Sequence, residues 1–189
     1  MAKSENKTDE ELVGLAIKDS HNFTLLIDRY EAKLSRYIYR LCGCRKEDIE
    51  DLLQEIFIKI YRNLNDFDQS LKFSSWAYRI AHNEVISHFR RSKSRPIDTE
   101  LIPDLDHSDK KSDDFIRTID AGLDKNKISE ILGMMDIRYK EVLVLRYFEE
   151  LEYTEISDII KKPMGTVATL LNRAKKQFRE KSVKLKIDF

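Results

Sequence analysis

Residues 153–179 carry small, hydroxyl, amide and cationic side chains at a spacing that could recognise a polar, negatively charged partner. The segment reads YTEISDIIKKPMGTVATLLNRAKKQFR. At about 100° per residue, one face of a helix here combines Gly165, Thr166, Thr169, Asn172, Arg173 and Lys176. Such groups hydrogen-bond to phosphate oxygens and to base edges in a DNA major groove. An ordinary solvated helical hairpin would show the same pattern.

Two helices joined by a tight turn must position this face. The first helix is indicated by Ile156, Ile159 and Ile160, and Pro163 prevents it from continuing through Lys161 and Lys162. The second helix has an apolar stripe at steps of three and four: Val167, Leu171, Ala174 and Phe178. The pattern predicts a helix-turn-helix. Its cations Lys175, Lys176 and Arg179 suit phosphate contacts.

A helix expected over about 47–63 carries a different kind of surface, which is acidic. Glu47, Asp48, Glu50, Asp51 and Glu55 place five acids in nine residues. Acids in a first turn complement the helix dipole. Glu55 lies two turns into the expected helix, where the helix dipole explains an acidic side chain poorly. A docking site for a basic partner and a simple capping role both remain open.

A third surface mixes aromatic and cationic groups in FSSWAYRIAHNEVISHFRR, a helix expected from about Phe73 to Arg91. Trp76, Arg79, Asn83 and Arg90 share one face, and such a face can stack on unpaired bases and neutralise phosphates. The preceding loop, 66–72, could form a wall of a base pocket. For Trp76 alone we favour a core role, whereas the set as a whole leaves both readings open.

Periodicity along the chain predicts an all-α protein of two small helical domains. Residues 1–92 form the first domain, with a further amphipathic helix over about 22–41, and residues 123–189 form the second. Residues 93–122 hold two of the three prolines and many acids, which is typical of an acidic flexible linker. Helical periodicity resumes at about 116–123.

Charge is segregated although the formal net charge is zero. Residues 161–186 contain nine cations and one acid, whereas residues 92–122 contain eight acids and five cations. Because salt screens charges beyond roughly 10 Å, local charge governs the field at a surface. A neutral chain can therefore present a cationic face.

Several classes of protein are excluded or disfavoured. The four histidines show neither metal-ligand nor triad spacing, and no glycine-rich phosphate loop is present, so we expect no enzyme activity, metal, cofactor or small-molecule substrate. No apolar run suits membrane insertion or a secretory signal. We therefore expect a cytoplasmic protein with reduced thiols at Cys42 and Cys44.

Three motifs in order resemble an extracytoplasmic-function (ECF) sigma factor of the sigma-70 family. They are DIEDLLQEIFIKIYRNLNDFD, FSSWAYRIAHNEVISHFRR and LRYFEELEYTEISDIIKKPMGTVATLLNRAKKQFR. The resemblance implies core RNA polymerase and promoter DNA as partners, together with an anti-sigma factor. The alternatives are a stand-alone helix-turn-helix regulator and a helical adaptor that binds only proteins.

The resemblance also assigns roles by position. Core-polymerase binding, at the clamp helices of the largest subunit, falls to Asp48, Asp51, Gln54 and Glu55. Recognition and melting of the −10 element falls to Phe67, Trp76, Arg79, Asn83, Arg90 and Arg91. Recognition of the −35 element, by a domain docked on the polymerase flap, is assigned to Gly165, Thr166, Thr169, Asn172, Arg173, Lys175, Lys176 and Arg179.

The chain departs from the family pattern at four positions. Lys161 stands in the turn where glycine is usual, which predicts a strained or altered backbone. Ala168 and Leu170 replace common cations, which predicts weaker phosphate anchoring. Ser87 stands where Asp is common.

Overall fold

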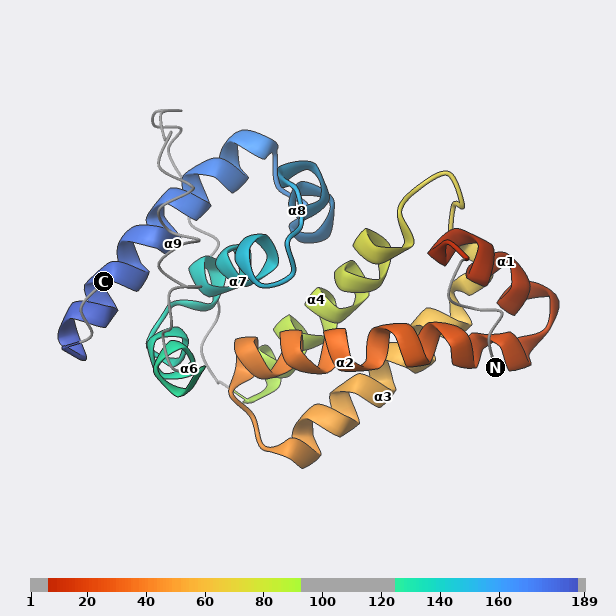
Figure 1. Cartoon of the computed structure of the whole chain (residues 1–189), viewed down its shortest axis with the longest axis horizontal. Coiled ribbons are helices and arrows are strands. Elements are labelled where there is room, and N and C mark those ends of the chain that lie inside the picture. Colours follow the sequence, from red (N-terminus) through yellow and green to blue (C-terminus); the bar gives the residue numbers. More distant parts are fainter. Residues whose placement is uncertain (1–6, 93–124, 187–189) are drawn as a thin grey trace. The chain divides into compact units, whose positions relative to one another are not determined.

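The computed structural model describes residues 7–92 and 125–186, and every regular element in these two ranges is a helix. The chain divides into two compact units, one built mainly from α1–α4 and the other from α6–α9 (Figure 1). This confirms the expected all-α class. The expected linker, and the periodicity at 116–123, lie outside the described residues.

Three long helices form most of the first unit, close to the expected bounds. They are α2 (Phe23–Cys42), α3 (Lys46–Arg62) and α4 (Phe73–Ser92), with a short 3-10 turn η2 (Leu64–Asp66) before the loop to α4. Their apolar stripes meet in a core whose largest fully buried members include Tyr30, Tyr37 and Phe73. The stripes face inward because each helix repeats apolar residues at three- and four-residue steps.

The first unit also contains a helix that the sequence analysis did not predict, α1 (Asp9–Lys18), followed by the 3-10 turn η1 (Ser20–Asn22). Thr8 and Glu11 form a capping box: the Thr8 N–H donates to Glu11 Oε2 at 2.9 Å, and the Glu11 N–H donates to Thr8 Oγ1 at 3.2 Å. The Thr-x-x-Glu spacing was the signal for this helix. Its apolar face buries Leu12, Val13 and Ala16.

The second unit contains α6 (Lys125–Gly133), α7 (Ile137–Tyr147), α8 (Tyr153–Ile160) and α9 (Met164–Lys184). The predicted stripe of α9 is completely buried: Val167, Leu171, Ala174 and Phe178 are each 0% exposed. Helix α9 packs against both α7 and α8. The structure thus confirms the predicted helix-turn-helix.

The two cysteines correct one expectation. Both are disulfide-bonded and neither is free, so the bond joins Cys42 to Cys44, the chain's two cysteines. The reduced thiols that we expected are therefore wrong for this structure. Gly43 between them has φ +59°, a left-handed conformation that lets the chain reverse sharply enough for the two cysteines to meet.

Candidate polymerase-binding and DNA-binding surfaces

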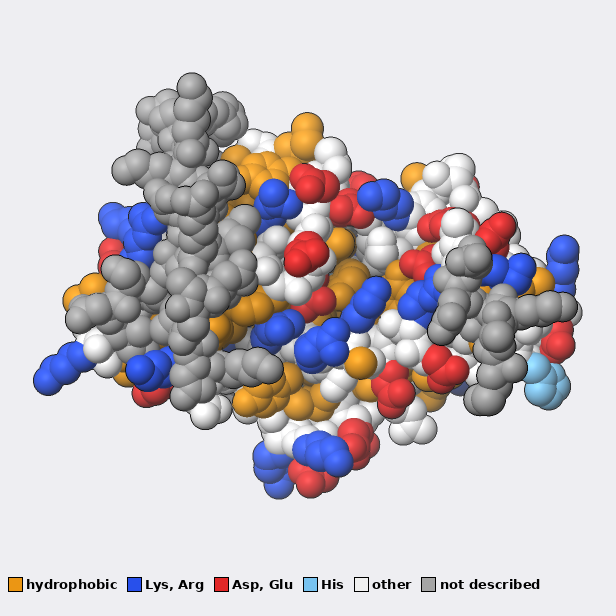
Figure 2. All heavy atoms as spheres, viewed as in Figure 1, with side chains coloured by type: hydrophobic (Ala, Val, Ile, Leu, Met, Phe, Trp, Pro, Cys, Tyr) orange, Lys and Arg blue, Asp and Glu red, His pale blue; other side chains and the backbone are white. Residues whose placement is uncertain are grey.

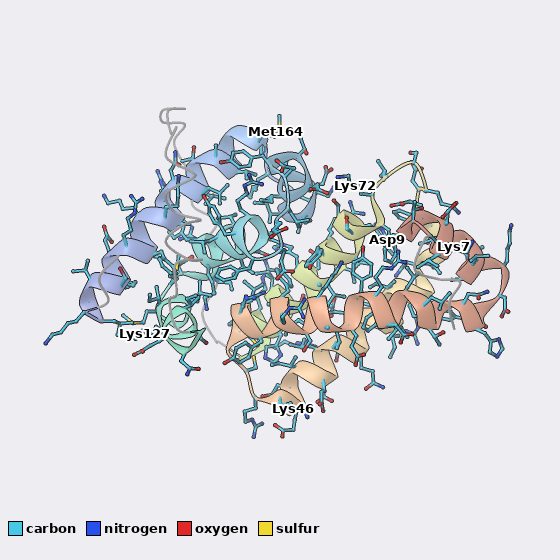
Figure 3. All side chains as sticks on the ribbon, in the orientation of Figure 1. Lys7, Asp9, Lys46, Lys72, Lys127 and Met164 are labelled. Carbon is cyan, nitrogen blue, oxygen red and sulfur yellow. The ribbon has the colours of Figure 1, made fainter. Side chains whose placement is uncertain are left out.

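The acidic surface lies on the solvent-facing side of α3. Asp51, Gln54 and Glu55 are exposed and Asp48 is half-buried. The opposite side of the helix contributes Ile49, Leu52, Leu53, Ile56 and Ile60 to the core. In Figure 2, acidic and basic side chains are interspersed over the first turns of α3, which Lys46 marks in Figure 3. The four residues of the predicted polymerase-binding set therefore share one accessible region.

One residue of the acidic set pairs with one of the −10 set. Arg91 Nη2 of α4 lies 3.8 Å from Glu55 Oε2 of α3. Both side chains are more than half exposed, so the pair contributes little to stability. Helical spacing alone could not reveal this pair because the two residues lie on different helices. At the start of α3, Asp48 Oδ2 lies 3.3 Å from Nε of Arg45, the residue just before the helix.

Phe67 and Trp76 of the predicted −10 set meet in an aromatic cluster at the start of α4. The ring centroid of Phe67 lies 5.1 Å from that of Trp76, and Phe73 lies 5.6 Å from Phe67 and 5.7 Å from Trp76. Phe67 is only 5% exposed, whereas Trp76 is half-buried. Trp76 thus packs against the buried Phe67 ring and still remains partly accessible to solvent.

The remaining −10 candidates follow along α4. Arg79 is half-buried, whereas Asn83, Arg90 and Arg91 are exposed. From Trp76 to Arg90 the helix rises roughly 20 Å. The stripe is therefore long enough to follow several nucleotides of a strand.

The loop before α4 is an ordered turn. Asp68 Oδ1 accepts a hydrogen bond from the Ser70 N–H at 2.9 Å, and the Leu71 N–H donates to the Asp68 carbonyl oxygen at 3.0 Å. The bond from the Ser70 backbone stabilises the carboxylate and holds the pKa of Asp68 below its ordinary value. The turn fixes the chain between Phe67 and the first residue of α4.

The predicted −35 surface of α9, whose first residue Met164 is labelled in Figure 3, is only partly accessible. Lys176 and Arg179 are exposed, and Gly165, Thr166, Asn172 and Arg173 are half-buried. Thr169 and Lys175 are buried, at 8% and 5% exposed. The Thr169 hydroxyl donates to the Gly165 carbonyl oxygen at 3.0 Å, one turn back. Six of the eight candidates thus reach solvent here.

Lys161 adopts a left-handed backbone in the turn between α8 and α9, with φ 54° and ψ 49°. The Lys161 N–H donates to the Ser157 carbonyl oxygen, and the Ser157 hydroxyl donates to the Lys162 carbonyl oxygen at 2.6 Å. These bonds hold the turn in the conformation that glycine adopts most readily. Of the two outcomes predicted at Lys161, the structure shows the strained backbone and not an altered one: a residue with a Cβ occupies the left-handed conformation.

The described residues offer neither a metal-binding cluster nor a helix that could span a membrane. Within residues 7–92 and 125–186, no three His, Cys, Asp or Glu side chains gather in a way that could hold a metal ion. In the same ranges, no helix combines the length and the apolar character needed to cross a membrane.

Two family profiles define the class of protein to which these units belong. The profile described as Sigma-70 region 2 matches residues 26–95, and that described as Sigma-70, region 4 matches residues 125–178. The chain is 33% identical to the ECF RNA polymerase sigma factor SigW of Bacillus subtilis (strain 168), over 86% of this chain and 89% of that protein. It is 30% identical to the ECF RNA polymerase sigma-E factor of Haemophilus influenzae, over 94% and 97%. The chain belongs to the sigma-70 family, in its ECF group.

Solved structures share this fold. CnrH, solved in complex with the cytosolic domain of CnrY, aligns with a TM-score of 0.69 at 20% identity, over 97% of this chain and 100% of that chain. The sigma factor RpoE of Bartonella quintana, solved with the anti-sigma factor NepR, aligns with a TM-score of 0.65 at 20% identity, over 89% and 99%.

Proposed function

We propose that this protein is an alternative sigma factor, which binds core RNA polymerase and directs it to promoters through their −10 and −35 elements. The observation that carries the proposal is the occurrence of both sigma regions, in order, on two helical units of one chain. The protein then acts as a transcription initiation factor with no reaction of its own. Its place of action is the cytoplasm, where the polymerase works.

In this proposal the first unit binds polymerase and opens DNA. The exposed acids of α3 bind a basic surface on the clamp helices of the largest subunit. Trp76 and the polar stripe of α4 bind the separated −10 strand. Stacking and phosphate contacts on one helix face suit single-stranded DNA, since every base has an aromatic face.

The second unit reads the −35 element with α9 while docked on the polymerase flap. Asn172 and Arg173 are suited to base edges, and Lys176 and Arg179 to phosphates. An anti-sigma factor completes the set of partners. The structure of RpoE with the anti-sigma factor NepR supports this last proposal because a chain of the same fold was solved with such a partner.

Core binding tests the proposed polymerase surface. We expect the wild-type protein to bind purified core RNA polymerase in a pull-down, and Asp51→Arg with Glu55→Arg to weaken binding at least tenfold. Reversing two charges replaces attraction by repulsion at the same site. The matched control is Asp28→Arg with Glu31→Arg, which makes the same charge change on exposed residues of α2.

The function and the location of the surface are tested by different outcomes of this experiment. Wild-type protein that fails to bind core overturns the proposed function. Unchanged binding by the α3 variant overturns the location of the surface and leaves the function standing. Equal loss in the α2 control also contradicts the location, because net charge alone then explains the effect.

A further inference from the structure

Helix α1 lies against the start of α4 and the loop before it. The N–H of Phe73, the first residue of α4, donates to Glu10 Oε1 at 3.0 Å. A Cβ added to Gly14 of α1 would lie 3.7 Å from the Gln69 side chain of that loop. In Figure 1 the loop passes beside α1 before α4 begins. A helix near the N-terminus thus touches the segment assigned to the −10 element.

Helix α1 is itself firmly held. Its capping box fixes the first turn, and Asp9 Oδ1 accepts a hydrogen bond from Arg29 Nη1 of α2 at 2.6 Å. The Tyr30 hydroxyl donates to the other oxygen of the Asp9 carboxylate. Figure 3 labels Asp9 at the start of α1 and Lys72 just before α4. Glu10 therefore projects from an anchored turn.

The contact matters because the first N–H groups of a helix have no partner within that helix. A carboxylate there accepts one of them and also interacts favourably with the positive end of the helix dipole. Phe73, which donates the bond, packs against Trp76 and Tyr30, with ring centroids 5.7 Å and 5.3 Å away. Holding the Phe73 backbone therefore also holds the Trp76 ring.

We propose that Glu10 is a positioning residue for promoter opening: it fixes the N-terminus of α4 so that Trp76 and the 67–72 loop are ready to receive an unpaired base. This inference rests on the proposed function. It adds a residue of α1 to that function, although α1 holds none of the residues assigned to DNA. The proposed role of Glu10 involves no contact with a nucleotide.

The first test uses Trp76, the only tryptophan in the chain, as a probe in the free protein. We expect Glu10→Ala to raise acrylamide quenching of Trp76 fluorescence, and Glu10→Gln to leave it close to wild type. The amide oxygen of Gln accepts the same hydrogen bond. The matched control is Glu31→Ala, which removes an exposed carboxylate from α2. Circular dichroism verifies equal helix content.

The second test measures opening with the full protein bound to core polymerase. The template is a promoter found by start-site mapping, once as duplex and once with a mismatched −10 bubble. We expect Glu10→Ala to slow permanganate reactivity at −10 by about fivefold to tenfold on the duplex, the factor that corresponds to the free energy of a typical helix cap. The bubble template is read by run-off transcript yield instead, since its bases react with permanganate without any protein. We expect Glu10→Ala to give the wild-type yield there because no opening is needed.

These results separate positioning from general damage. The proposal is overturned if Glu10→Ala opens the duplex as fast as Glu31→Ala, or if it is impaired equally on both templates. It is also overturned if Glu10→Gln is as defective as Glu10→Ala. Wild-type protein that neither opens the duplex nor gives a transcript from the bubble template overturns the proposed function, and the role of Glu10 in opening falls with it. Trp76 quenching still decides whether the Glu10 contact positions the ring.

Discussion

Lys161 carries backbone strain in the turn of the helix-turn-helix. A left-handed backbone at a residue with a Cβ costs about 1 kcal/mol relative to glycine. We therefore expect Lys161→Gly to raise the free energy of unfolding by about 1 kcal/mol in urea titrations. Lys162→Gly is the matched control because it removes the same charge at a neighbour whose φ is not positive. A stabilisation equal in both variants, or a loss in Lys161→Gly, would contradict the strain.

Tyr30 makes the stability of the protein depend on pH in the alkaline range. Burial, then its hydrogen bond to Asp9, raises the pKa of Tyr30 far above its ordinary value. The unfolded chain ionises first, so stability is full below about pH 10 and falls as pH rises above it. We expect the urea midpoint to fall less between pH 9 and pH 10.5 in Tyr30→Phe than in wild type. Equal falls would show that Tyr30 ionises as it does in the unfolded chain.

At the scale of elements, an ion pair fixes α3 against α4, the two helices assigned to polymerase and to DNA. Lys59 Nζ lies 2.5 Å from Glu84 Oε1, and the Glu84 side chain is 8% exposed. Removing the cation leaves a buried carboxylate without that partner, so Lys59→Met should cost about 1–2 kcal/mol of unfolding free energy.

The control for this pair is Arg62→Met, which removes an exposed cation one turn further along α3. Adding Glu84→Leu to Lys59→Met should recover much of the loss because the buried charge is then gone as well. A loss as large in Arg62→Met, or no recovery in the double variant, would show that the ion pair is not the cause.

Helices with long apolar stripes were predictable from sequence, whereas contacts between helices were not. The stripe from Val167 to Phe178 marks α9 and its buried side because helical period alone determines which residues face inward. The burial of Lys175 and the pair of Glu55 with Arg91 depend on how elements pack, which spacing along one helix does not record. Helix α1 could have been predicted from its capping box, but its contact with α4 could not.

At the scale of the molecule, DNA affinity depends on which cations of a neutral chain are accessible. Each phosphate contact adds about 0.9 to the salt dependence of binding. Lys176 is exposed and Lys175 is buried, so Lys176→Ala should flatten the plot of log K against log salt by about 0.9. Lys175→Ala should leave that slope unchanged. Fluorescence anisotropy with random-sequence duplex measures both.

A flattened slope in Lys175→Ala would mean that this lysine leaves its buried position to contact DNA. For the wild-type protein alone, we expect weak binding that falls steeply with salt. Tight binding that is insensitive to salt would contradict a phosphate-driven interaction.

As a sigma factor, this chain gives core polymerase its choice of promoter. Run-off transcription tests it most directly, with purified core, the wild-type protein and a template whose start site was mapped after overexpression. We expect one transcript from the mapped start when both proteins are present, and none from core alone or from a template with a scrambled −10 element. No transcript with the complete set, or the same transcript from the scrambled template, would contradict it.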